Sequence, residues 1–164
     1  MERKYLTEWK RFLSEKTDYT PFIAMNDLAV NIAMTGGAGI AGINTGQSVV
    51  GNTLSVTTKP GKYDIADDTM SISIGTQSQQ KFACTGVKIS GPQSNLALKQ
   101  GRDWWIEPDG WCRILLSLDR IWDWAGDYVE IQEKIQLIIS SNAEEDPFFI
   151  DIDLGNSRFS DTRG

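Results

Sequence analysis

Apolar residues that alternate with small or polar residues constrain the fold of this chain more than any other feature. Such a period of two is typical of half-buried strands, because successive side chains point to opposite faces of a sheet. The pattern occurs at Leu28, Val30, Ile32 and Met34; at Leu54, Val56 and Thr58; at Met70, Ile72 and Ile74; and at Phe148, Ile150, Ile152 and Leu154. These four stretches predict a mostly β protein.

The second half of the chain extends the same pattern. Cys112, Ile114, Leu116 and Leu118 alternate inward. Apolar residues fall on even positions at Phe82 and Cys84 but on odd positions at Val87 and Ile89. This change of parity, with Gly86 in between, indicates an inserted bulge residue. Turn residues then recur at intervals typical of an antiparallel sandwich, at Pro92, Asn95, Gly101, Pro108, Gly110 and Gly126.

One segment, from Tyr128 to Ser140, is compatible with two structures. Its isoleucines would line a helix with a capping box at Asp127 and Glu130, whereas the strand interpretation leaves only Glu133 out of place on the inner face. The alternating strand that follows, from Pro147 to Gly155, favours a strand here as well.

The start of the chain differs from the rest, because its apolar residues recur at helical spacing. Charged residues surround an aromatic stripe, which predicts one amphipathic helix over residues 2–16; the stripe consists of Tyr5, Trp9, Phe12 and Leu13. A helix of about four turns is marginal alone in water. We therefore expect the stripe to dock, either on its own domain or on a partner.

The length of 164 residues fits one domain with its own core. We divide the chain into an N-terminal helix or arm (1–19), an apolar strand with a Gly-rich loop (20–50), an immunoglobulin-like β-sandwich (51–155) and a C-terminal tail (156–164). The expected fold class is thus an antiparallel sandwich with one short N-terminal helix.

Composition excludes several kinds of chemistry. The chain has no histidine, which removes Ser-His-Asp triads, Cys-His pairs and HExxH zinc sites. Its net charge of −6 disfavours binding to nucleic acid. We expect no enzyme activity, no cofactor and no metal.

Two cysteines, Cys84 and Cys112, lack the spacing of redox or zinc sites and are interpreted as buried apolar residues.

The charged N-terminal segment contains no apolar core of a signal peptide, and no stretch of about 20 apolar residues could span a bilayer. We therefore expect neither a secretion signal nor a membrane segment.

A glycine motif, Gly37-Ala38-Gly39-Ile40-Ala41-Gly42, matches the dinucleotide fingerprint GxGxxG. That motif requires a following helix, whose N-terminus holds the pyrophosphate. The next residues contain two more glycines and the pair Val49-Val50, which argue against a helix. A flexible or tightly packed glycine loop is the preferred interpretation.

Four segments in order resemble an immunoglobulin-type sandwich of the Hydin or choice-of-anchor kind, a relative of major sperm protein domains, over about residues 80–155. They are Lys88-Ile89-Ser90-Gly91-Pro92, Ile106 to Ile114, Ala125-Gly126-Asp127-Tyr128 with its following strand, and Ser141-Asn142 through Asp146-Pro147 to Leu154-Gly155. The resemblance implies a protein that binds, anchors or scaffolds. The inserted residues 142–146 depart from the family pattern.

A second resemblance concerns the N-terminal helix. The segment from Leu6 to Leu13 is similar to the short leader of many T4-like cyanophage proteins. It implies a virion component, assembled in the host cytoplasm and contacting other virion proteins and copies of itself.

Five of the six tryptophans lie between Trp104 and Trp124. Trp104 and Trp105 are adjacent and must point to opposite faces of a strand, so at least one belongs to the core. Trp122 and Trp124 share strand parity and would form a patch for a protein partner or a glycan. A core role for the whole cluster is the remaining alternative.

Acidic residues cluster at Asp67-Asp68, Glu144-Glu145-Asp146 and Asp151-x-Asp153. They lack the ligand spacing of an EF-hand, and solvated turns and outer faces are the preferred interpretation.

These observations predict a non-enzymatic structural protein of a tailed-phage virion, in the capsid decoration, neck or tail. It would act through protein contacts at Tyr5, Trp9, Phe12, Leu13, Trp122 and Trp124. The alternative is a carbohydrate-binding sandwich that uses exposed tryptophans, and a small glycosidase is the least favoured.

Overall fold

The computed structural model describes residues 24–36, 39–78, 84–91, 94–125, 134–141, 146–154 and 157–160. The expected N-terminal helix lies outside these residues, as do Tyr5, Trp9, Phe12 and Leu13. No helix in the described ranges is both long enough and apolar enough to cross a membrane.

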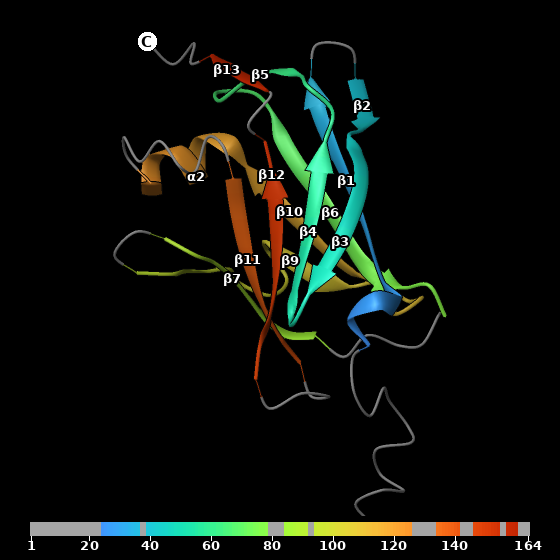
Figure 1. Ribbon diagram of the computed structural model, residues 1–164. Coiled ribbons are helices and arrows are strands. Elements are labelled where there is room, and N and C mark those ends of the chain that lie inside the picture. Colours follow the sequence, from blue (N-terminus) through green and yellow to red (C-terminus); the bar gives the residue numbers. More distant parts are fainter. Residues whose placement is uncertain are drawn as a thin grey trace, which may run out of the picture.

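Two sheets face each other (Figure 1). The first has five antiparallel strands in the order β2 (Gly39–Gly42), β1 (Leu28–Gly36), β6 (Thr69–Thr76), β10 (Cys112–Ser117) and β9 (Trp104–Ile106). The second has six strands in the order β3 (Asn44–Val50), β4 (Thr53–Thr58), β12 (Phe148–Asp153), β11 (Lys134–Ser141), β7 (Cys84–Ile89) and β8 (Leu96–Ala97).

Shorter elements complete the described part of the chain. A small parallel sheet of β5 (Lys62–Asp64) and β13 (Arg158–Ser160) lies across one end of the sandwich, at the top of Figure 1. A 3-10 turn, η1 (Met25–Asp27), precedes β1. The helix α2 (Leu118–Ala125) directly follows β10.

The strand order is that of an immunoglobulin-type sandwich. In such a fold strands A, B, E and D form one sheet, and G, F and C form the other. Here β1-β6-β10-β9 takes the first order and β12-β11-β7 the second. The expected sandwich is therefore confirmed, with the addition that β4 runs parallel to β12 and not antiparallel.

The core confirms the predicted alternation. All four members of the first and last apolar series are buried, and so are the inward residues of β6, β10 and β11. Because residues of β1 and β4 join the same core cluster as residues of β10, β11 and β12, the segments on both sides of position 50 share one core.

Two local expectations are also confirmed. The strand interpretation holds for β11, which excludes a helix over Lys134–Ser141; residues 126–133 lie outside the described ranges. At the start of β7, Ser140 pairs with Gly86 but Ser141 pairs with Cys84, so one extra residue, Thr85, is inserted next to Gly86.

The last four residues of the glycine motif form a strand, and Gly37 and Ala38 lie outside the described residues. β2 returns antiparallel along β1, with Gly36 opposite Gly39, and β3 follows it after Ile43. The expected glycine loop is therefore wrong for Gly39–Gly42. No helix begins after the motif, so it lacks the N-terminus that a dinucleotide requires.

Candidate functional site

The structure separates the tryptophans into different environments. Trp104 is buried in the core, with 2% of its surface exposed, and its indole Nε1 donates to the carbonyl of Leu98 at 3.3 Å. Trp105 points the other way and is half-buried. The prediction that the adjacent pair is split between two faces is therefore confirmed.

Trp122 and Trp124 lie in α2 and not in a strand. Positions two apart on a helix do not face each other. The predicted strand is therefore wrong at these positions, and the argument from strand parity no longer applies. The alternation that begins in β10 ends at Ser117, where the chain turns into the helix. Their role in partner binding remains a prediction.

Two other tryptophans share a face, on the hairpin of β9 and β10. Trp105 pairs across the hairpin with Arg113, and the amide of Glu107 donates to the carbonyl of Trp111. Trp105 Nε1 also donates to Glu107 Oε1 at 2.8 Å, and Arg113 forms an ion pair with the same oxygen at 3.5 Å. This outer face therefore carries two indoles, of which Trp105 is bonded to the carboxylate that also pairs with Arg113.

The hairpin turn explains the position of Trp111. Pro108, Asp109 and Gly110 form a three-residue loop in which the amide of Gly110 donates to the carbonyl of Glu107, and Gly110 has a φ of 92°. A type I turn followed by a left-handed glycine is a usual way to make such a loop. Directly after it, Trp111 folds back over β6.

Trp111 lies flat on Gly75. A Cβ atom at Gly75 would come within 2.2 Å of Cδ2 and Cε2 of the indole, so only glycine admits the ring here. An open hollow of about 570 Å³ lies beside the ring on the outer face of the five-stranded sheet. It is lined by Asn31, Ser73, Glu107, Pro108, Asp109, Trp111 and Arg113.

The first predicted acidic pair, Asp67 and Asp68, lies in the turn after β5. Asp68 is buried, and its Oδ2 accepts the amide of Asp64 at 2.6 Å, which closes the turn after β5. The solvated interpretation is wrong for Asp68 but holds for its exposed neighbour Asp67. Burial, followed by the charge of Asp68, raises the pKa of the nearby Tyr63.

The second acidic pair lies on the outer face of β12, as predicted. Asp151 is held by Lys134 at 3.1 Å and by Gln136 Nε2 at 2.8 Å, and Asp153 is exposed. Glu144 and Glu145 lie outside the described residues, and Asp146 is exposed. Within the described ranges, no three acidic or cysteine side chains are grouped closely enough to hold a metal ion.

Asp103 is a buried carboxylate that the sequence did not single out. It is 5% exposed and accepts hydrogen bonds from the amide of Lys99 at 2.7 Å, from Arg102 and from Arg120. Burial opposes its ionisation, but the hydrogen bonds from Arg102, Lys99 and Arg120 outweigh burial and lower the pKa of Asp103 to about 2. It ties the connection before β9 to α2.

The two cysteines face each other across the sandwich, Cys84 from β7 and Cys112 from β10. Both are buried and free, as the sequence predicted. A hydrogen bond with Cys84, together with burial, raises the pKa of Cys112.

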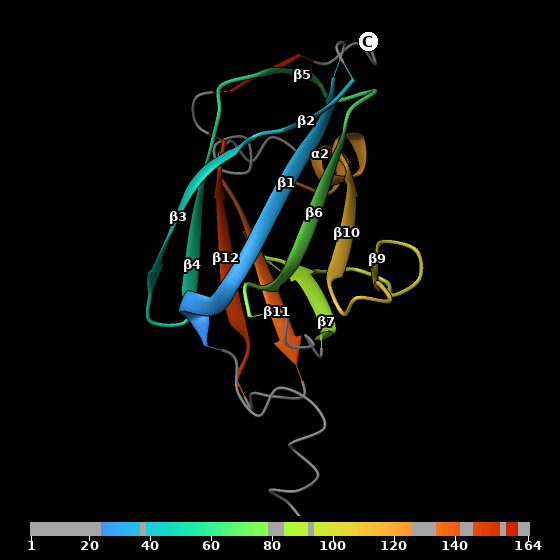
Figure 2. The same cartoon turned by 90° about the vertical axis from the view of Figure 1, so that its right-hand side faces the viewer.

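Among the strands that the structure describes, edges are exposed on two sides of the sandwich. We call the side formed by β2 and β3 the open side, and the side formed by β8, β9 and residues 99–103 between them the charged side. Along the chain no charged residue occurs between Asp27 and Lys59, so β2 and β3 carry neither charge nor proline. Figure 2 shows β3 along one margin of the molecule, with β4 beside it.

Amide side chains attach β3 to the opposite sheet. Asn44 Oδ1 accepts the amide of Ile32 at 3.1 Å, and Asn44 Nδ2 donates to the carbonyl of Val30 at 3.0 Å. Gln47 Nε2 donates to the carbonyl of Leu28 at 2.9 Å. These bonds satisfy the edge of β1 but leave β3 with a strand partner on one side only, among the described residues.

The sequence contained signals for both surfaces. The open side could have been found from the charge-free run that includes two strands, because natural edges usually carry charges. The paired tryptophans could have been found from their equal parity around the Pro-Asp-Gly turn. Nothing in the local pattern indicates Asp103, whose partners come from three separate positions.

Comparisons with models of protein families, with curated protein sequences and with solved structures give no match to this chain.

Proposed function

We propose that this chain is a non-enzymatic structural and assembly protein of a tailed-phage virion, which acts through protein–protein contacts. The observation that carries the proposal is the open side. Exposed strand edges are templates for pairing with other chains, and proteins that stay monomeric usually block them with charges, proline or short strands. β3 is an edge strand of seven residues that contains no charged residue and no proline, and it is not short.

The state of the charged groups also supports a structural role. The buried carboxylates Asp68 and Asp103 are occupied by turn and ion-pair hydrogen bonds. Such groups stabilise a fold, whereas a catalytic acid or base must reach a substrate. The resemblance of residues 6–13 to cyanophage leaders adds the expected location in the virion.

The test is mass spectrometry of density-purified particles assembled in the presence of the full chain. We expect the chain as a stoichiometric component of the particle, and a chain lacking residues 1–16 to be lost from it while its sandwich still folds. Recovery of the full chain only in the particle-free fraction would overturn the virion proposal. Normal incorporation of the shortened chain would overturn the role of Tyr5, Trp9, Phe12 and Leu13.

A second candidate function is carbohydrate binding, and the surface beside Trp111 favours it. An indole fixed on Gly75 offers a flat apolar face for a sugar ring. Glu107, Asp109 and Arg113 around it provide planar polar groups for hydroxyls. This moves the proposed glycan surface from Trp122 and Trp124 to the β9–β10 hairpin.

Titration with a panel of oligosaccharides, followed by tryptophan fluorescence, tests this candidate. We expect saturable quenching that Trp111→Ala abolishes and Gly75→Ala weakens, because the added Cβ displaces the ring. Leu115→Ala, at an exposed position on the same face that does not line the hollow, is the matched control and should retain binding. Unchanged fluorescence across the panel, or quenching that survives Trp111→Ala, would exclude the surface.

A further inference from the structure

The edge of β3 is the longest free strand edge in the described part of the chain. β3 has seven residues, compared with four in β2, three in β9 and two in β8. A bulge lies near its start, where Asn44 pairs with Thr58 and Gly46 with Thr57. From Gly46 to Val50 the pairing with β4 is regular, so the opposite edge of this stretch can accept another strand.

The side chains of β3 are also exposed. Thr45 to Ser48 are exposed to solvent, and Val50, with 79% of its surface accessible, is the most exposed large apolar residue in the described ranges. Ser48 lies opposite Ser55 on the outer face of the sheet. An approaching strand would therefore meet small, polar and apolar side chains and no charge.

We infer that β3 pairs antiparallel with β3 of a second copy of this chain, which joins two six-stranded sheets into one continuous sheet across a two-fold axis near Ser48. The biological role of this dimer rests on the proposed function in the virion. It names a second copy as the partner that the open side binds.

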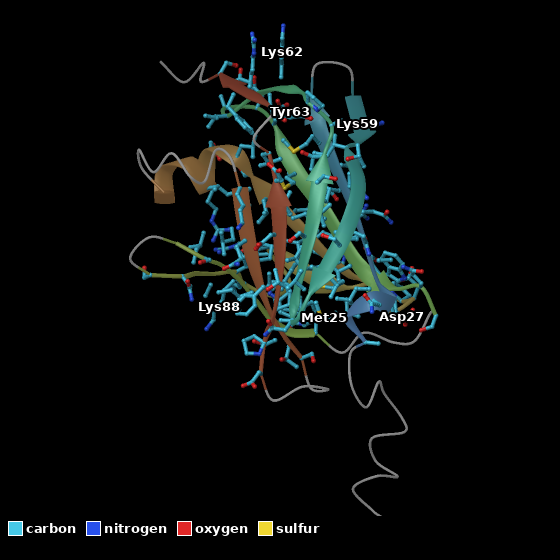
Figure 3. The ribbon with its side chains drawn as sticks, in the orientation of Figure 1. Met25, Asp27, Lys59, Lys62, Tyr63 and Lys88 are labelled. Atoms are coloured by element: carbon cyan, nitrogen blue, oxygen red, sulfur yellow. The ribbon has the colours of Figure 1, made fainter. Side chains whose placement is uncertain are left out.

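Charge is the reason to expect a second copy. In a two-fold contact each residue meets the same surface of its mate, so any charge on the edge would meet its own sign. The chain carries a net charge of −6, so two copies repel each other overall. β3 is free of charge, and the residues that bound the charge-free run, Asp27 and Lys59, lie near opposite ends of the sandwich (Figure 3).

The size of the contact sets its expected strength. A seven-residue strand is about 24 Å long. Pairing along such a length buries less surface than a standard interface, so we expect a weak dimer in solution. In a particle that displays many copies, the same pairing would be strengthened by effective concentration.

Sedimentation velocity of the full chain, at concentrations up to about 1 mM, tests the inference. We expect a monomer–dimer equilibrium. Ser48→Lys and Ser48→Glu should each weaken dimerisation about tenfold or more, because like charges then meet across the axis. An equimolar mixture of the two variants should dimerise again, because opposite charges now meet.

Ser55→Lys is the matched control. It places the same charge on the same face, one strand further in, where Asp151 lies opposite it on β12. We expect it to dimerise like the unmodified chain. In a second measurement, mild oxidation of Ser48→Cys should yield a covalent dimer, whereas Ser55→Cys should stay monomeric.

A monomer at every concentration, or a dimer that Ser48→Lys leaves intact, overturns self-pairing. So does a mixture of the lysine and glutamate variants that stays monomeric. A monomer whose incorporation into particles is lost in Ser48→Lys would assign the edge to a foreign strand instead. If the chain dimerises but is absent from particles, the self-pairing of β3 is supported and the virion proposal is refuted. Failure of self-pairing and failure of the virion proposal therefore give different results.

Discussion

The open side and the charged side of the sandwich satisfy their strand edges by different means. On the charged side the edge strands are only two and three residues long, and Asp103 fixes the connection between them through Arg102, Arg120 and the amide of Lys99. On the open side the strands are longer and uncharged, and neutral amides of Asn44 and Gln47 hold β3 to β1.

The two kinds of edge differ in how readily they can pair with another chain. Short, charged edges discourage pairing with another chain, because an added strand gains few hydrogen bonds and must desolvate charges. A long neutral edge has neither obstacle. Both sides are attached to the rest of the sandwich by side-chain hydrogen bonds, so the contrast concerns binding and not stability alone.

The largest expected effect concerns the charged side. Asp103→Ala should lower the free energy of unfolding by about 3 kcal/mol, because it removes a buried charge that accepts three sets of hydrogen bonds. Urea denaturation measures the loss. Asp67→Ala, at an exposed position, is the control and should change stability by less than about 0.5 kcal/mol. Equal effects of the two variants would contradict the anchoring role of Asp103.

The pH dependence of stability is a second test of the anchoring role of Asp103. The pKa of Asp103 is lowered from 3.8 to about 2 in the folded chain, so the ionised carboxylate stabilises the fold above pH 3.8. That contribution, about 2 kcal/mol, is lost as the pH falls from 4 toward 2. The difference in unfolding free energy between the unmodified chain and Asp103→Asn should shrink over this window. A constant difference would show that Asp103 does not titrate as proposed.

On the open side, Asn44→Ala should cost about 2 kcal/mol, because the amide of the buried Ile32 loses its acceptor and the carbonyl of Val30 loses a donor. Gln47→Ala, which removes a single bond to Leu28, should cost about half as much. Hydrogen exchange at Ile32 is a direct readout and should accelerate only in the first variant. Identical exchange in both variants would argue against attachment through Asn44.

Gly51→Ala tests the turn that ends β3. Gly51 has a φ of 62° and no atom lies within 4 Å of an added Cβ, so the cost of about 1 kcal/mol should come from the backbone alone. Gly46→Ala, where the added Cβ would be 3.5 Å from Thr57 Oγ1, should be nearly neutral. Thermal denaturation of both variants measures the difference, and a cost that is larger for Gly46→Ala would refute the turn geometry.

The smallest expected effect on stability is that of Ser48→Lys. An exposed strand position tolerates substitution within about 0.5 kcal/mol. Its thermal midpoint should therefore match that of Ser55→Lys, although the two variants differ in association. A large loss of stability in Ser48→Lys would mean that altered association reports unfolding and not edge pairing.

The strands were the most predictable part of this protein. Alternation at Leu28 to Met34 and at Phe148 to Leu154 predicted both the strands and their buried faces, because one side of each strand must avoid water. The bulge next to Gly86 followed from a change of parity. Neither inference needed knowledge of the neighbouring strand.

The helix α2 and the strand β2 were not predictable in the same way. Leu118 continues the inward alternation of β10 but is already helical, so periodicity alone did not reveal the change at that point. The glycines of β2 have little strand propensity, and their pairing with β1 stabilises them in the sheet. In both cases tertiary contacts override a local preference.

Two properties could be read from the chain alone: a layered β fold, from the period of two, and the lack of histidine chemistry, from the missing side chain. The three-dimensional arrangement was needed to show that Trp111 lies on Gly75, that Asp103 joins two arginines, and that β3 is an edge. The physical reason is that neighbours distant in sequence determine burial, ion pairing and free hydrogen-bonding edges, and local periodicity carries no information about those neighbours.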